Sequence, residues 1–112
     1  MKLAFTTKGT SWDSMMDPRF GRTEYFLIYD QEKDELNSFD NKSIEHQAHG
    51  AGPKTAQKLF EFGVNVLITG NGPGGNAESI LKSMNLKIYT GAGEMTVKEA
   101  YEAYKANKLS EF

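Results

Sequence analysis

The stretch VNVLITGNGPGGNAESILKSM, residues 64–84, decides the fold that the chain can adopt. It begins with Val64–Thr69, a short apolar and β-branched run that is typical of a buried strand. A glycine-rich segment follows. Four apolar residues then recur at the i, i+3, i+4 and i+7 spacing of one helix face: Ala77, Ile80, Leu81 and Met84. A strand, a glycine-rich turn and an amphipathic helix together predict an α/β fold.

Further strands and helices are expected on both sides of this unit. Apolar and alternating runs predict strands at Lys2–Thr6, Glu24–Asp30, Glu35–Asp40 and Leu86–Thr90. One helix is expected after the loop Asn41–Gly50, with Pro53 in its first turn, apolar residues Ala56, Leu59 and Phe60 at helical spacing, and Gly63 at its end. The capping box Thr96–Glu99 opens another. The predicted order is therefore βββαβαβα. Its second half requires parallel strands with right-handed crossovers, whereas the leading hairpin requires an antiparallel strand, so the sheet should be mixed.

The size and composition of the chain indicate one self-sufficient domain over residues 1–112. A domain of this length buries enough surface to fold without disulfide bonds. The chain contains no cysteine. This excludes disulfides, thiolate zinc sites, thiolate-held iron–sulfur clusters and cysteine nucleophiles.

Charge and hydropathy exclude two classes of partner. Thirteen basic and fifteen acidic residues give a net charge of −2, which argues against a general nucleic-acid binder. The first residues turn polar at Thr6–Lys8 before an apolar signal region can form, and no apolar run is long enough to span a bilayer. We therefore expect a cytoplasmic protein with no membrane partner.

A ligand site is expected beyond the carboxyl ends of the strands, where open α/β sheets bind their ligands. Three loops should converge there: Thr7–Gly21, Ile44–Gly52 and Gly70–Asn76. In the last loop, glycines allow close approach of a ligand, and the free N–H groups at the helix start favour an anion. Its candidate binding residues are Gly70, Asn71, Gly72, Gly74, Gly75 and Asn76. The P-loop ending and the dinucleotide pattern of glycines are both absent, and a simple tight connection explains the loop equally well.

Two arginines are the second candidate for binding an anion. Arg19 and Arg22 lie within four residues of each other, and guanidinium groups hold carboxylates or phosphates by paired hydrogen bonds. The alternative is an ordered loop in which Asp17 pairs with one arginine while Met15 and Met16 pack.

The two histidines of the chain are candidate metal ligands. His46 and His49 stand three residues apart just before a predicted helix, and neutral imidazole is a common metal ligand. Two solvated loop histidines are the alternative. His49 is the first choice because it directly precedes the Gly50–Gly52 segment at the helix start.

Several of these motifs together resemble a known family. The segment DPRFGR at residues 17–22, followed by YFLIYD at 25–30, is similar to the opening signature of the dinitrogenase iron–molybdenum cofactor biosynthesis family. The resemblance continues through His49–Gly52, Gly70–Ala77 and Thr96–Tyr101, and it covers nearly the whole chain. It implies a three-layer α/β/α fold of the ribonuclease-H-like type with a mixed five-stranded sheet.

The resemblance also implies a function. Members of this family include nitrogenase accessory proteins that bind and carry the iron–molybdenum cofactor or its precursor. We therefore expect a non-catalytic carrier that binds the cofactor or a precursor iron–sulfur cluster transiently and folds without it. Arg19, Arg22 and the glycine-rich loop would hold the anionic charge, and His49 or His46 would ligate metal. Cofactor-assembly proteins are further candidate partners.

Two other functions stay open from the residues alone. A binding module for an anionic nucleotide or phosphate-containing metabolite would use the same arginines and glycine-rich loop without metal. A ribonuclease-H-like hydrolase would need carboxylates clustered on or near the central strands. The first predicted strand, Lys2–Thr6, carries none, so this function is the weaker alternative.

Overall fold

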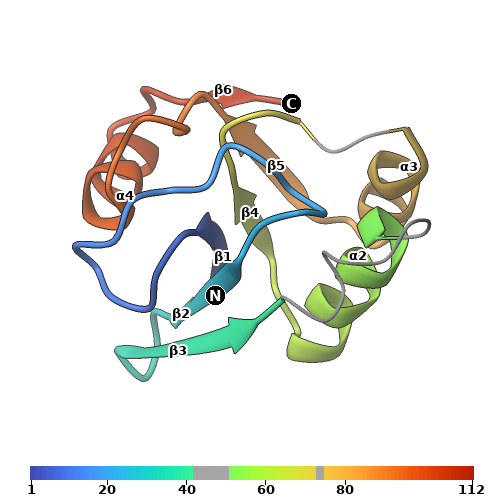
Figure 1. Cartoon of the computed structure of the whole chain (residues 1–112), viewed down its shortest axis with the longest axis horizontal. Coiled ribbons are helices and arrows are strands. Elements are labelled where there is room, and N and C mark those ends of the chain that lie inside the picture. The colour runs from blue at the N-terminus through green and yellow to red at the C-terminus, as the bar shows by residue number, and fades with distance from the viewer. Residues whose placement is uncertain (42–50, 73–74) are drawn as a thin grey trace.

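A mixed six-stranded sheet forms the middle layer of the computed structural model, which describes residues 1–41, 51–72 and 75–112 (Figure 1). The strands are β1 (Lys2–Thr7), β2 (Tyr25–Asp30), β3 (Glu35–Asp40), β4 (Val66–Ile68), β5 (Lys87–Thr90) and β6 (Ser110–Glu111). The helices are α2 (Ala51–Phe62), α3 (Gly75–Ser83) and α4 (Val97–Lys105). The strand order across the sheet is β3-β2-β1-β4-β5-β6.

The pairing of the strands confirms the mixed sheet. Strand β1 pairs antiparallel with β2 on one side and parallel with β4 on the other. Strand β5 continues the parallel half, and the β2–β3 hairpin supplies a second antiparallel pair. The eight expected elements follow one another along the chain as the sequence indicates.

The expected number of five strands is wrong, because β6 adds a sixth strand to the edge of the sheet. This strand has two exposed residues, Ser110 and Glu111, which pair antiparallel with Thr90 and Tyr89 of β5. Two polar residues show no alternating apolar pattern, so sequence reasoning had no signal for them. The ribonuclease-H-like assignment stays a prediction from the resemblance.

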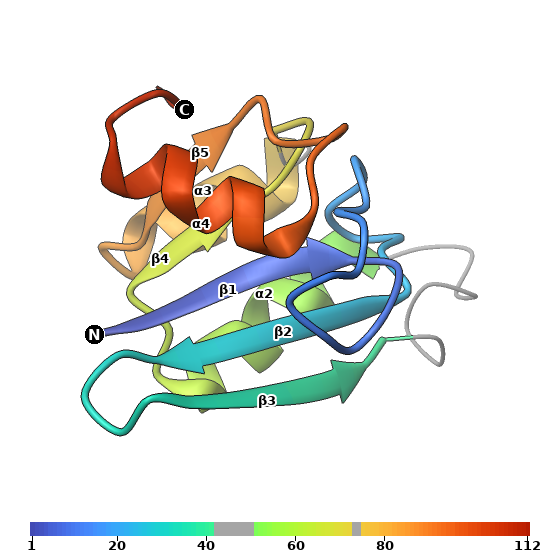
Figure 2. The ribbon, with the colours of Figure 1, turned by 90° about the vertical axis from the view of Figure 1, so that its left-hand side faces the viewer.

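Helices cover both faces of the sheet. In Figures 1 and 2, α4 lies on one face, and α2 and α3 lie on the other. Successive residues of a strand point to opposite faces, so each central strand contributes to two cores. In β4, Leu67 packs in the core beneath α2 and α3, and its neighbours Val66 and Ile68 pack in the core beneath α4.

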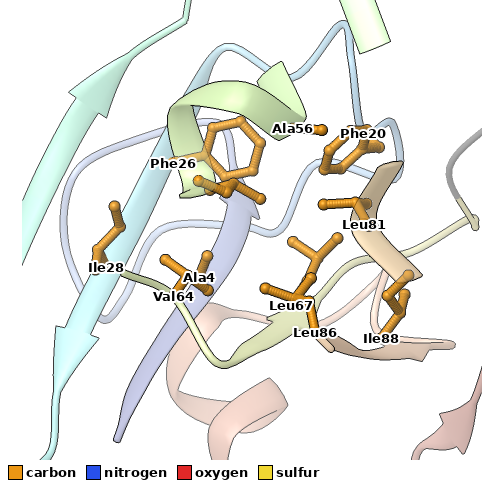
Figure 3. Close-up of a cluster of buried hydrophobic side chains, with 11 residues drawn as sticks. Ala4, Phe20, Phe26, Ile28, Ala56, Val64, Leu67, Leu81, Leu86 and Ile88 are labelled. Carbon is orange, nitrogen blue, oxygen red and sulfur yellow. The ribbon is translucent and has the colours of Figure 1, made fainter. Parts of the chain in front are cut away.

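The core beneath α2 and α3 is drawn in Figure 3. Leu67 contributes to its centre, and Leu59 of α2 and Leu81 of α3 close it from the helix side; all three side chains are fully buried. Ala56 of α2 is also buried there, and the remaining buried members come from the strands and connecting loops: Ala4, Phe20, Phe26, Ile28, Val64, Leu86 and Ile88. Leu59 and Leu81 therefore meet the sheet as predicted, whereas Phe60, expected on the same face of α2, is 60% exposed.

Helix α4 begins at the capping box that the sequence indicates. The Glu99 N–H donates to the Thr96 hydroxyl at 3.2 Å, and the Thr96 N–H donates to the Glu99 carboxylate at 2.9 Å. The first helical N–H groups donate to loop carbonyls: Val97 to Ser14 and Lys98 to Trp12, both at 2.9 Å. These bonds dock residues 8–24 against the start of α4.

No helix in the described part of the chain is both long and apolar enough to cross a bilayer.

We predict that Leu67→Ala lowers the free energy of unfolding by about 2–5 kcal/mol, since it opens a cavity in a fully buried position. Phe60→Ala is the matched control, because Phe60 is 60% exposed and its truncation should change stability by only about 0.5 kcal/mol. Urea unfolding followed by circular dichroism measures both. Equal losses for the two variants would contradict the assignment of Leu67 to the core.

Candidate functional site

Three loops meet at the carboxyl ends of β1, β4 and β5. They are residues 8–24 after β1, the segment after β4 that begins at Thr69, and residues 91–96 after β5. Backbone hydrogen bonds join them, among them Asn71 N–H to the Pro18 carbonyl (2.8 Å), Gly91 N–H to the Gly70 carbonyl (3.0 Å) and Met16 N–H to the Met95 carbonyl (2.8 Å). The expected convergence is therefore present for two of the predicted loops, Thr7–Gly21 and the described part of Gly70–Asn76.

An open hollow of about 480 Å³ lies where these loops meet. We call it the rim hollow. It is lined by Pro18, Gly70, Asn71, Gly91, Gly93, Glu94 and Met95. Four of these residues come from residues 91–96, a loop that sequence reasoning did not include in the site. The sequence did contain a signal for this loop. Gly91 and Gly93 follow a predicted strand directly, just as Gly70 follows β4.

The glycines around the hollow are required for different reasons. A Cβ at Gly70 would lie 2.6 Å from the Pro18 Cα and 2.8 Å from the Gly93 Cα, so close packing of the three loops excludes a side chain. A Cβ at Gly72 would overlap the ring of Phe112. Gly91 has a φ of +98°, a conformation that residues with side chains rarely adopt. Packing and backbone geometry thus explain these glycines before any ligand is considered.

Two buried hydroxyl groups hold the ends of β1 and β4 together beneath the hollow. Thr6 and Thr69 are fully buried, and their hydroxyl oxygens lie 2.9 Å apart. The Thr6 hydroxyl also donates to the Asp17 carbonyl at 2.7 Å. Because a buried hydroxyl needs a partner, these contacts fix residue 17 over the end of β1.

Asp17 pairs with Arg19, as in the alternative reading of this segment. The Arg19 Nε donates to Asp17 Oδ1 at 3.0 Å, and Nη2 donates to Oδ2 at 2.9 Å. The backbone N–H groups of Arg19 and Glu24 also donate to this carboxylate, at 3.0 and 3.3 Å. The Asp17 side chain is fully buried, whereas that of Arg19 is 53% exposed. This bidentate pair holds the loop and presents the guanidinium at the surface.

These contacts also determine the protonation of Asp17. Burial raises the pKa of this carboxyl group, but the hydrogen bonds and charge of Arg19 and the N–H of Glu24 outweigh burial and hold its pKa below the ordinary value. Asp17 is therefore a buried carboxylate whose charge is compensated locally.

Neither Arg19 nor Arg22 is among the described residues that line the rim hollow. Arg22 is exposed on the loop that continues from Pro18. Within the lining, Glu94 contributes a carboxylate and Met95 a thioether, while Pro18 and the glycines contribute mainly backbone. Binding of a ligand by Arg19 and Arg22 stays a prediction.

The other predicted residues are only partly described. His46, His49 and Gly74 lie outside the described residues, so their metal-binding and anion-binding roles stay predictions. Gly75 and Asn76 open α3, whose first turn also contains Glu78. Across residues 1–41, 51–72 and 75–112, no group of three or more histidine or acidic side chains could hold a metal ion.

Comparisons with known proteins connect this architecture to one family. The family model described as dinitrogenase iron-molybdenum cofactor matches residues 1–107. The uncharacterized protein MJ0580 of Methanocaldococcus jannaschii is 30% identical over 105 residues, which cover 89% of this chain and 85% of that protein.

Two solved structures are similar to this chain over almost its whole length. The apo form of the orange protein from Desulfovibrio gigas has a TM-score of 0.93 and 30% identity, covering 99% of this chain and 92% of its own. A Thermotoga protein that is a candidate NifB protein of the DUF35 family has a TM-score of 0.84 and 39% identity. That alignment covers 98% of this chain and 91% of the Thermotoga chain.

We predict that Arg19→Ala makes the protein more sensitive to acid. Because the pKa of Asp17 is lowered on folding, its carboxylate stabilises the folded state at pH values above its pKa in the unfolded chain, about 3.9. This stability is lost as pH falls through the lower pKa of the folded state. Without Arg19 the folded pKa rises, so acid unfolding should move to higher pH, and stability at neutral pH should fall by about 1.5–3 kcal/mol.

The measurement is acid unfolding followed by tryptophan fluorescence, with Lys87→Ala as the control. Lys87 is an exposed cation at the amino end of β5, away from Asp17. An unchanged acid midpoint in Arg19→Ala would show that the backbone N–H groups alone stabilise the carboxylate.

Proposed function

The chain belongs to the dinitrogenase iron–molybdenum cofactor family, and from this membership we propose that it binds or carries an anionic metal-containing group without catalysing a reaction. The group would be of the iron–molybdenum cofactor type or a precursor iron–sulfur cluster, bound as cargo. Cofactor-assembly proteins are the partners that such a role requires, and the cytoplasm is its expected location.

The observation that carries this proposal is the rim hollow at the carboxyl ends of the parallel strands. Ligands of open α/β sheets bind at this edge, and the hollow of about 480 Å³ has the size of a small-ligand site. Family relationship supports the same conclusion. The Desulfovibrio relative was solved in an apo form, which implies that it takes up a further group, and the Thermotoga relative is described as a candidate NifB protein.

The chemistry of the loops suits a cluster that carries negative charge. The amide of Asn71 lies in the hollow lining, and α3 begins at Gly75, where the first N–H groups of a helix favour an anion. The guanidinium of Arg19 is positioned by Asp17, and Arg22 is exposed on the same loop. The carboxylate of Glu94 would repel an anion in the hollow. The arginines beside the hollow would therefore have to supply the positive charge that offsets this repulsion.

Metal ligation would come from imidazole, because the chain has no thiolate. We assign this role to His49 first and His46 second, from the sequence alone. Met95 adds a thioether, a soft and polarizable group, to the hollow lining.

A second candidate is a site for an anionic nucleotide or a phosphate-containing metabolite. The observation that favours it is the lining itself, in which backbone predominates and the described residues provide no metal-holding group. This site would use Arg19, Arg22 and the Gly70–Asn76 loop in the same way. The two functions differ in whether metal is retained.

We predict that the protein retains iron and molybdenum after anaerobic incubation with isolated iron–molybdenum cofactor followed by desalting. Arg22→Ala should weaken retention about ten- to a hundredfold, since loss of a charge-assisted hydrogen bond costs about 1.5–3 kcal/mol. Arg19→Ala should do the same with an added loss of stability, and Lys87→Ala should behave as the native protein. Binding of ATP without retention of metal would support the second candidate instead.

Retention should also depend on neutral imidazole. We predict that it weakens as pH falls through the histidine range near ~6.5 and that His49→Ala removes this dependence, with His46→Ala having the smaller effect. Metal analysis across this range in the three proteins measures it. Retention that stays constant or rises toward acid in all three would exclude metal ligation by histidine, since protonated histidine only adds attraction for an anion.

A further inference from the structure

Asn71, in the lining of the rim hollow, differs from the other asparagines in the residue that follows it. The chain has seven asparagines, and only Asn71 is followed by a glycine, Gly72. The backbone nitrogen of a following residue can attack the asparagine side chain, and a glycine offers no Cβ to hinder that approach. We propose that Asn71 is a site of spontaneous deamidation, which converts a neutral amide in the hollow lining into a carboxylate.

The reaction needs only water. The Gly72 nitrogen forms a bond to the Asn71 side-chain carbon, Cγ, and loses its proton, while the amide nitrogen leaves as ammonia. The product is a five-membered succinimide ring. Water then opens the ring at one of its two carbonyl carbons and gives aspartate or isoaspartate. One water is consumed, one ammonia is released, and nothing is oxidised or reduced.

The structure makes Asn71 accessible to this reaction. Asn71 is exposed in the loop after β4, so water and base reach its side chain. Other asparagines are held differently. The Asn41 side chain is buried and donates to the carbonyls of Gly21 and Thr23 at 3.2 and 3.0 Å. Asn37, which precedes a small serine, lies in β3 opposite Ile28, where the strand ladder restrains its backbone.

Two contacts work against the reaction and slow it. The ring of Phe112 packs directly on Gly72, and the Asn71 N–H is bound to the Pro18 carbonyl at 2.8 Å. Both contacts restrain the backbone, so the folded protein should react more slowly than a free peptide of the same sequence. Comparing the two measures this restraint.

The consequence for binding rests on the proposed function. A carboxylate at residue 71 would join Glu94 in the lining of the hollow and repel an anionic ligand. One unit charge about 4 Å from another in water changes affinity roughly fivefold. Isoaspartate would also lengthen the main chain by one carbon between the Pro18 contact and α3. Deamidation therefore weakens anion binding in the hollow as the protein ages.

The first experiment incubates the purified native chain at mildly alkaline pH and follows each asparagine peptide by mass spectrometry. We expect the amide-to-acid mass gain at Asn71 before any other asparagine, with isoaspartate detected by methyltransferase labelling. Asn71→Gln should show no gain at this position, because glutamine would have to close a slower six-membered ring. A synthetic peptide of residues 68–75 is the reference. Conversion of this peptide with an unchanged Asn71 in the folded chain would overturn the proposal.

The second experiment tests the consequence with tetrathiomolybdate as the anionic probe. Asn71→Asp and the aged protein should bind it roughly fivefold more weakly than fresh native protein. Asn37→Asp, which adds the same charge on the distant strand β3, should bind as the native protein does. Equal binding by Asn71→Asp would overturn the charge effect. Failure of fresh native protein to bind would contradict the proposed function, whereas the mass measurement alone decides deamidation.

Discussion

Strand β1 is buried on both faces and paired on both edges, and this constraint organises the rest of the molecule. Leu3, Ala4 and Phe5 have no exposed surface. Because a buried backbone must have all of its hydrogen-bonding groups paired, β1 needs a neighbour on each side, which β2 and β4 supply. Because its side chains alternate, it also needs a helix layer on each face. The two cores and the three layers follow from this one strand.

The same strand connects the fold to the candidate site. At its carboxyl end, Thr6 binds the Asp17 carbonyl and meets Thr69 of the β4 loop. The loop that leaves β1 is therefore fixed over the neighbouring strand ends, and Pro18 comes into contact with Gly70 and Gly93. The rim hollow lies on the surface where these closely packed loops meet.

Negative and positive charge lie at different places on this edge of the sheet. The hollow itself is lined by backbone, with Glu94 as its charged side chain among the described residues, and the guanidinium of Arg19 is held beside it by a buried carboxylate. Positive charge is therefore available beside the hollow and not within its described lining. The proposed binding of a metal-containing anion depends on this charge, and family membership supports that proposal.

Sequence by itself determined the features that depend on local patterns. Hydrophobic periodicity predicted the first five strands and the helices α2, α3 and α4, and the capping box predicted the start of α4, because these signals lie within a few consecutive residues. The glycine-rich loop and DPRFGR were also recognisable as the segments from which a site could be built.

Only the tertiary structure decided which of these residues act on one another. Strand β6 exists because β5 offers an unpaired edge, and its own two residues carry no strand pattern. Asp17 lies over the end of β1, where it pairs with Arg19, because its carbonyl accepts a hydrogen bond from the buried Thr6 hydroxyl. Gly70 is required by two backbones distant in sequence, those of Pro18 and Gly93. Each of these outcomes depends on contacts between residues far apart in the chain, which a local pattern cannot contain.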